Sequence, residues 1–213
     1  MSTLVWSPFH PRYLTALSVF DCSDRSGTAR EWEREVNLWI RNQTEEGVLH
    51  DINNLDADVW IYSNENNRIV GYGSLAPGLW GSVRGVDDER IPVNLLFMVG
   101  LDSYYQSKPQ TDNKLHRYSY QIIRDLMAKA LKRKHHSTLL GLFVHPENEK
   151  ARNWYKEKLG FRYLDGHSEY SETYKVHYPA MWLDMRRIKK SLKIEELAEC
   201  PARTRLLPPS DAE

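Results

Sequence analysis

The sequence predicts a mixed α/β domain built around one β-sheet, and three observations support this fold class. Two β-rich runs flank the turn signal "NENN" at residues 64–67, which indicates a hairpin. The runs 93–101 and 139–144 are apolar without alternation, as is typical of strands covered on both faces. A helical segment of crossover length separates these two runs, so we predict that they are parallel strands of the sheet.

The first 50 residues predict a short strand, a short helix and then an amphipathic helix over residues 28–47. Thr28 and Glu31 have the spacing of a capping box at its start. Gly47 suits a cap at its C-terminal end. Four large apolar side chains fall on one face of this helix: Trp32, Val36, Trp39 and Ile40.

The rest of the chain continues the alternation of helices and strands. In chain order we predict a helix at 115–134, a helix at 148–160 closed by Gly160, strands at 161–164 and 180–185, and a short charged helix at 188–199. We therefore expect one domain over residues 1–186, followed by a C-terminal helix and a Pro-rich mobile tail over residues 187–213.

Composition narrows the functional classes. The 213 residues hold 29 Lys and Arg against 29 Asp and Glu, and this neutral balance disfavours a nucleic-acid partner. No apolar run reaches the roughly 20 residues of a membrane span, and the first residues lack a signal-peptide pattern. Cys22 and Cys200 are far apart and match no metal or redox spacing, so we expect free thiols, a cytoplasmic location and no metal site.

One motif carries most of the functional information. Asn148 and Tyr155 are seven residues apart on the helix predicted at 148–160, so both side chains lie on one helical face. Each residue alone has an ordinary explanation, since Asn is a common N-cap and a helical Tyr often packs against a core. Together with Ala151 and with Leu-Gly-Phe at 159–161, however, they form a longer pattern that neither explanation covers.

This string resembles the motif that follows the fifth strand of the Gcn5-related N-acetyltransferases (GNAT). A second segment, "VGLDSYYQSK" at residues 99–108, resembles the fourth strand of that family and the turn after it. The likeness covers roughly residues 1–186. It implies a GNAT-like acyl-CoA N-acyltransferase fold, in which the two parallel central strands splay apart beyond a bulge in the fourth strand.

The resemblance also implies a function and a set of site residues. The family moves an acetyl group from acetyl-CoA, its co-substrate, to a primary amine by direct attack within a ternary complex. Tyr155 would be the catalytic general acid that protonates the departing CoA thiolate. The residues that would bind the pantetheine arm and the pyrophosphate of acetyl-CoA are Val99, Gly100, Leu101, Gln106, Ser107, Lys108, His116, Arg117, Tyr118, Ser119, Asn148 and Ala151.

The phosphate-binding loop departs from the family pattern, which reads Gln/Arg-x-x-Gly-x-Gly/Ala. Gln106 is present, but no glycine occurs from residue 101 to residue 140, and the glycine positions fall near Arg117 and Ser119. Either hydroxyl and cationic side chains of this loop bind the phosphates instead, or the site is weakened or lost. The second reading makes the chain a degenerate GNAT-fold binding or regulatory module.

The general base is not evident from the sequence. Some branches of the family carry Glu five residues before the motif Asn, where this chain has Phe143. The alternatives are a chain of water molecules or one of five side chains: Asp87, Asp88, Glu89, Asp102 and His145. Of these, Asp102 has a simpler explanation as a turn residue.

The acceptor is expected to be a small-molecule amine or an amine of a protein or peptide. Residues 21–50, 76–91 and 165–179 would shape its site. Aromatic and acidic side chains there suit a cationic amine, although exposed aromatics are common on protein surfaces. The aromatics concerned are Trp39, Trp60, Trp80, Tyr170 and Tyr174. The length of the acyl chain and pairing as a homodimer, which is frequent in this family, stay open.

Overall fold

The computed structural model describes residues 4–23, 30–80, 91–106, 118–133, 137, 139–171, 175–188 and 202–204. Its strands are β1 (Leu4–Pro8), β2 (Asp58–Ser63), β3 (Ile69–Trp80), β4 (Ile91–Leu101), β5 (Leu139–Phe143), β6 (Arg162–Ser171), β7 (Val176–Asp184) and β8 (Ala202–Thr204). Its helices are α1 (Tyr13–Leu17), α2 (Glu31–Ile40), α3 (Val48–Asn54), α4 (Ser103–Gln106), α5 (Tyr118–Lys132), α6 (Glu149–Leu159) and α7 (Met185–Ile188).

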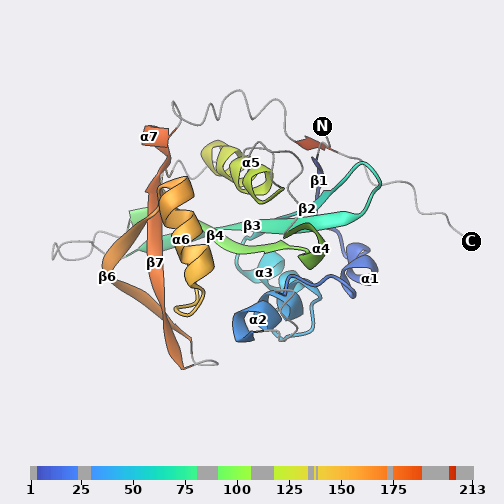
Figure 1. Cartoon of the computed structure of the whole chain (residues 1–213), viewed down its shortest axis with the longest axis horizontal. Coiled ribbons are helices and arrows are strands. Elements are labelled where there is room, and N and C mark those ends of the chain that lie inside the picture. The colour runs from blue at the N-terminus through green and yellow to red at the C-terminus, as the bar shows by residue number, and fades with distance from the viewer. Residues whose placement is uncertain are drawn as a thin grey trace, which may run out of the picture.

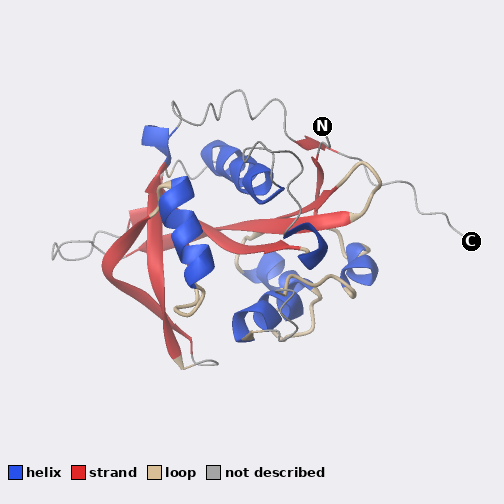
Figure 2. Ribbon diagram, viewed as in Figure 1, coloured by secondary structure: helices blue, strands red, loops and turns tan. Residues whose placement is uncertain are grey.

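The strands form one eight-stranded sheet with the order β6-β7-β5-β4-β3-β2-β1-β8 (Figure 2). The hairpin predicted around residues 64–67 is the antiparallel pair β2–β3, and β4 pairs antiparallel with β3. β4 and β5 are parallel, with α5 as the crossover between them, which confirms the prediction from the two apolar runs. The mixed α/β class is therefore confirmed.

Helices cover both faces of the sheet (Figure 1). α5 packs on one face of β2–β4, and α1, α2 and α3 pack on the other. The alternation of side chains along β2 explains this, because Val59 and Ile61 join the core under α1–α3 whereas Tyr62 joins the core under α5. A strand with apolar side chains on both faces needs a helical layer on each side.

The central strands diverge soon after they pair. β4 and β5 share only the registered pairs Asn94–Leu140 and Leu95–Gly141. Just beyond them β4 carries a bulge, where two residues, Phe97 and Met98, lie opposite the single residue Ser74 of β3. The Met98 N–H donates to Ser74 Oγ at 2.8 Å. Phe97 and Met98 both contact the core under α1–α3, as expected where a bulge interrupts the alternation.

The end of α2 differs from the prediction. The chain leaves the helix at Asn42, whose φ of 55° is left-handed. The Asn42 N–H donates to the Trp39 carbonyl, and the Gln43 N–H donates to the Leu38 carbonyl. This pattern is a Schellman motif, in which Asn replaces the more usual Gly. Gly47 is consequently not the cap of this helix but the N-cap residue of α3.

The start of α2 also lies later than predicted. Arg30 occupies the N-cap position, and its backbone N–H donates to Glu33 Oε2 at 2.8 Å. Thr28, which we expected to cap the helix together with Glu31, lies outside the described residues. The reciprocal contact of a capping box is thus made by Arg30 and Glu33, each two positions after the predicted residue.

Parts of the C-terminal region enter the fold. Gly160 ends α6 with φ of 77°, which confirms its predicted role as a C-cap. Residues 202–204, which we expected to be part of a mobile tail, form β8 and pair in parallel with β1. Residues 189–200, where most of a charged helix was predicted, lie outside the described residues. Among the helices that are described, none combines the length and the apolar character needed to cross a membrane.

Candidate active site

Tyr155 lies in the middle of α6 and is partly buried. Its ring packs edge-on against Phe161 at 5.5 Å and against Trp154 at 5.2 Å between centroids. Its hydroxyl makes no hydrogen bond with the part of the chain that the structure describes, and burial raises the pKa of the phenol above its ordinary value. The phenol therefore stays protonated at neutral pH and has a hydrogen bond left to give.

Asn148 is the N-cap residue of α6. Its Oδ1 accepts a hydrogen bond from the Ala151 N–H at 3.1 Å, and its own N–H donates to the His145 carbonyl at 2.9 Å. The simpler explanation given by the sequence, an N-cap, therefore holds for its side-chain oxygen. Ala151 packs against the core under α5. A contact of either residue with acetyl-CoA stays a prediction.

Residues Val99–Leu101 occupy the part of β4 beyond the bulge. There they pair with β3 on one side. On the other side they lie beyond the two residue pairs that join β4 to β5. A Cβ on Gly100 would lie 2.4 Å from the ring of Tyr72, so this glycine is required by the packing of that ring. The Leu101 carbonyl accepts a hydrogen bond from Gln106 Nε2 at 2.9 Å.

Gln106, at the end of α4, ties two segments together. Besides bonding Leu101, its Nε2 donates to the Cys22 carbonyl at 2.6 Å. Cys22 is held in turn by Asn37 of α2, whose Oδ1 accepts from the Cys22 N–H at 2.9 Å and from its thiol at 3.0 Å. Burial raises the pKa of the Cys22 thiol to about 12, so this thiol is unreactive at neutral pH. The side chain of Gln106 thus holds the segment before α2 against the end of β4.

The predicted phosphate-binding residues are only partly described. Tyr118 is the first residue of α5 and its buried ring packs edge-on against Tyr105 at 5.3 Å. Ser119 follows it in the first turn of α5 and is partly buried. The remaining predicted residues of this loop lie outside the described residues: Ser107, Lys108, His116 and Arg117.

Two of the candidate general bases are described. Asp102 Oδ1 accepts a hydrogen bond from the Tyr104 N–H at 2.9 Å at the start of α4, which is the turn role that the sequence favoured. His145 follows β5 and is 5% exposed. Its ring stacks on Trp32 of α2 at 4.6 Å and meets the ring of Tyr178 edge-on at 5.3 Å. Asp87, Asp88 and Glu89 lie outside the described residues.

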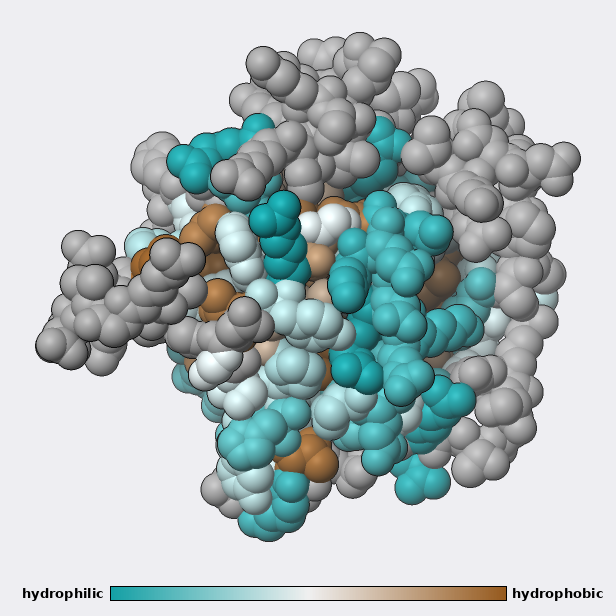
Figure 3. Space-filling model, turned by 60° about the vertical axis from the view of Figure 1, so that its left-hand side comes forward, coloured by the Kyte–Doolittle hydropathy of each residue, from teal (hydrophilic) through white to brown (hydrophobic). Residues whose placement is uncertain are grey.

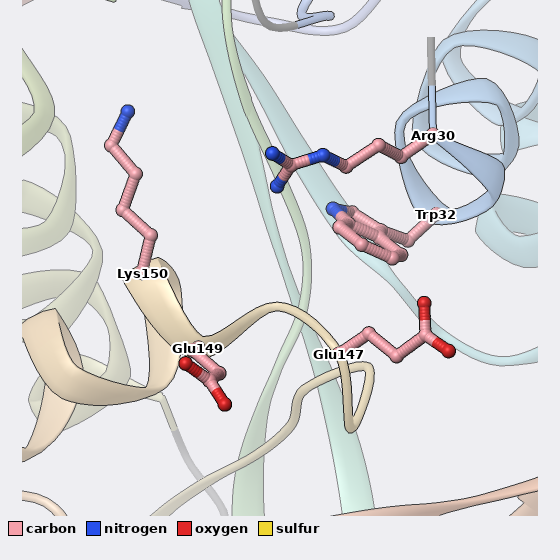
Figure 4. Close-up of a pocket in the computed structure, with 5 residues that line it drawn as sticks. All are labelled: Arg30, Trp32, Glu147, Glu149 and Lys150. Atoms are coloured by element: carbon pink, nitrogen blue, oxygen red, sulfur yellow. The ribbon is translucent and has the colours of Figure 1, made fainter. Parts of the chain in front are cut away.

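A cavity of about 650 Å³ opens between the start of α2 and the start of α6 (Figure 4). Arg30 and Trp32 form its α2 side, and Glu147, Glu149 and Lys150 form its α6 side. Because the α6 side directly follows β5, the cavity lies at the end of the strand that separates from β4. Its lining combines two cations, two carboxylates and an indole.

Solved structures of other proteins share the fold of this chain. No protein-family model and no curated protein matches the chain. A structure of AtaT complexed with acetyl-methionyl-tRNAfMet and one of AtaTR bound with acetyl-CoA each superimpose with a TM-score of 0.57, at 18% and 16% identity. They cover 89% of this chain and 99% and 98% of the AtaT chains.

Two further structures agree. A chimera of the Vibrio cholerae spermidine N-acetyltransferase SpeG and hSSAT has a TM-score of 0.55 at 12% identity, over 87% of this chain and 98% of the chimera. A GNAT-family acetyltransferase of Staphylococcus aureus Mu50 has a TM-score of 0.52 at 16% identity, over 85% and 99%. This chain has the GNAT fold. The fold that the resemblance implied is therefore confirmed, with its sheet parted at β4 and β5.

Within the GNAT fold, some expected acceptor-site residues take other roles. Trp39 and Trp80 are buried, with 3% and 8% of their surfaces exposed, and Trp39 Nε1 donates to Asp51 Oδ2 at 2.6 Å. Trp39 belongs to the core under α1–α3, and Trp80, the last residue of β3, belongs to a smaller core with Val93, Leu164 and Ala180. Tyr170 is exposed at the outer strand β6, and Tyr174 lies outside the described residues.

The sequence reasoning missed the role of Trp32. We expected its side chain on the apolar face of α2, together with Trp39 and Ile40. Those two are buried, whereas Trp32 lines the cavity and stacks on His145. Trp32 lies in the first turn of α2, beyond the edge of the core, and only the position of β5 reveals this.

Proposed function

We propose that the chain is an N-acetyltransferase that moves the acetyl group of acetyl-CoA to a primary amine by direct attack in a ternary complex. The observation that carries this proposal is the separation of β4 from β5 beyond Leu95, next to the bulge at 97–98. On the helix that follows β5, Tyr155 offers a protonated hydroxyl that makes no hydrogen bond with the described part of the chain. An open strand edge and a proton donor are what a thioester-bearing arm would need.

The chemistry follows from these groups. The nitrogen of a neutral amine attacks the thioester carbonyl carbon, the C–N bond forms and the C–S bond breaks. The departing thiolate takes the phenol proton of Tyr155, whose raised pKa keeps that proton available. A backbone N–H on the parted edge of β4 would stabilise the developing oxyanion. The proton lost by the amine passes to a base or to water, so charge and atoms balance.

The structural relatives support the donor more than the acceptor. The toxin AtaT is described with acetyl-CoA in a Tyr-to-Phe variant, and AtaT is also described with acetyl-methionyl-tRNAfMet. SpeG is a spermidine N-acetyltransferase. These acceptors share an amine and differ in charge, since spermidine is a polycation and a tRNA is a polyanion. We therefore infer acetyl-CoA as the co-substrate and a primary amine as the acceptor.

Two measurements test the proposal. Calorimetric titration with acetyl-CoA should give micromolar binding, and thiol release in the presence of an amine panel should exceed the rate without amine. Binding without turnover for any amine would favour the alternative, a binding or regulatory module of GNAT fold. Absence of acetyl-CoA binding would overturn the proposed function.

A further inference from the structure

The charges around the cavity between α2 and α6 are arranged unevenly. Figure 4 shows the guanidinium of Arg30 reaching across the indole of Trp32 toward the side where Lys150 stands. The carboxylates of Glu147 and Glu149 point away from the space between these two cations. A ligand that enters this space therefore meets positive charge on two sides.

The indole that forms one wall of this space is held in position. Trp32 stacks on the buried ring of His145 at 4.6 Å, and the Arg30 guanidinium carbon lies 5.4 Å from the centre of the indole. His145 Nδ1 accepts a hydrogen bond from the Glu147 N–H at 3.2 Å, which fixes the loop between β5 and α6. One wall of the cavity is thus rigid and aromatic, and it presents a cation.

The other cation is available for a ligand. Lys150 is the second residue of α6, and its ammonium group contacts no carboxylate and no other acceptor within the described residues. It also lies at the end of the helix where the peptide dipoles favour an anion. A guanidinium and an ammonium that line one cavity suit a carboxylate or a phosphate.

We propose that this cavity binds the acceptor, and that the acceptor carries an anionic group, a carboxylate or a phosphate, beside its amine. The inference rests on the proposed function and names the acceptor class. The anionic group lies between Arg30 and Lys150, and Trp32 contacts the carbon chain. The amine then points along the end of β5 toward the gap between β4 and β5. An amine without an anionic group gains no contact with these two cations.

The test uses acceptor pairs that differ only in the anionic group. One pair is ethanolamine and phosphoethanolamine, and the other is propylamine and β-alanine. We expect kcat/KM to be about tenfold higher or more for the anionic member of a pair, as one charge-assisted contact gives. Lys150→Ala should raise KM about tenfold for the members that carry the phosphate or carboxylate and leave KM nearly unchanged for the members that lack it. Lys156→Ala is the matched control, because Lys156 lies further along α6 over the Tyr163 ring.

Direct binding of the four compounds, titrated with CoA present, gives a second readout that does not need turnover. Equal binding of both members of each pair, or no binding of the anionic members, overturns the inference. A Lys150→Ala variant that loses affinity for acetyl-CoA itself also overturns it, since the cations would then serve the CoA phosphates. If acetyl-CoA does not bind but the anionic amines still bind through Lys150, the proposed function fails while the anion site in the cavity stands.

Discussion

Tyr62 of β2 and Tyr155 of α6 belong to the same core, and burial raises the pKa of both phenols, yet their hydroxyls differ. Tyr62 is 0% exposed and donates to Asp125 Oδ2 at 2.6 Å. The hydroxyl of Tyr155 keeps some exposure and bonds to no described residue. Buried hydroxyls are nearly always paired in folded proteins. The contrast separates a region built for stability from one that leaves a polar group for a ligand.

The first region is a paired polar network between α5 and β2. Asp125 also pairs with Lys129 one turn further along α5. The Lys129 ammonium lies 3.7 Å from the centre of the Trp6 ring and 5.3 Å from that of Trp60. Each charge in this network has a partner, so the network holds α5 on the sheet without an unpaired buried charge.

Replacement of Asp125 should have the largest effect. Asp125→Ala leaves the Lys129 ammonium and the Tyr62 hydroxyl buried without their partner, and we expect the free energy of unfolding to fall by about 3–5 kcal/mol. Urea titration followed by circular dichroism measures this. Arg186→Ala, which removes an exposed guanidinium that pairs with Asp184, is the control and should change the free energy of unfolding less. A loss below about 1 kcal/mol for Asp125→Ala would contradict the role given to the network.

Tyr155→Phe should reduce the rate of acetyl transfer and leave the stability of the fold nearly unchanged. Because the hydroxyl has no described partner, its removal should change the free energy of unfolding by less than about 0.5 kcal/mol. The rate of acetyl transfer should fall about 100-fold or more, as for loss of a general acid. Thiol release at saturating acetyl-CoA gives the rate. A variant with a normal rate would show that this phenol is not the proton donor.

Tyr62→Phe is the matched counterpart of that variant, since it removes a hydroxyl from the paired network. We expect the free energy of unfolding to fall by about 1–2 kcal/mol, because one hydrogen bond to a buried carboxylate is lost. Asp125 keeps Lys129 as a partner, so turnover should stay close to that of the wild type. If Tyr62→Phe loses turnover and Tyr155→Phe loses stability, the two regions have been assigned the wrong way round.

A smaller effect is expected on the free energy of unfolding at alkaline pH, through the buried phenol of Tyr62. Burial raises the folded-state pKa of Tyr62 above the unfolded value of about 10. Both states keep the proton below about pH 10, and above it the unfolded chain ionises first, so stability falls as pH rises. We expect Tyr62 to account for about 1 kcal/mol of lost stability between about pH 10 and 11, and Tyr62→Phe to lack this part. Unfolding titrations of both proteins at the two pH values measure the difference.

The pH dependence of the rate adds a separate check on Tyr155. The general acid must be protonated, and its pKa is raised by burial, so the rate should not fall through this group near pH 10. A decline of the transfer rate with rising pH, centred well below pH 10, would then come from a group other than Tyr155. A decline that disappears in Tyr155→Phe would contradict the raised pKa.

The homodimer left open by the sequence stays a prediction. Figure 3 shows the side formed by β6, β7 and α6, where hydrophilic side chains dominate. Hydrophobic side chains appear there in small patches separated by polar ones. This side lacks the broad apolar surface that marks obligate interfaces, at least over the part of the chain that is described.

Local signals in the sequence predicted a large part of the fold. The apolar runs that became β4 and β5, the turn between β2 and β3, and the cap of α6 at Gly160 all depend on residues close together in the chain. The predictions that were wrong concern places where two local signals compete. The sequence predicts Gly47 as the end of α2, but Asn42 adopts the left-handed conformation first and ends the helix there. Glycine and asparagine both suit that position, and the sequence does not say which one is used.

The sequence by itself determined the seven-residue spacing of Asn148 and Tyr155, about two helical turns, because a helix repeats every 3.6 residues wherever it is. Only the tertiary structure decided that β4 and β5 part after Leu95, that the Tyr155 hydroxyl has no hydrogen-bond partner among the described residues, and that Arg30 and Lys150 face one cavity. Those features join residues distant in the chain. Their arrangement depends on how the bulge and the packing of α2 position the strands, which no local pattern encodes.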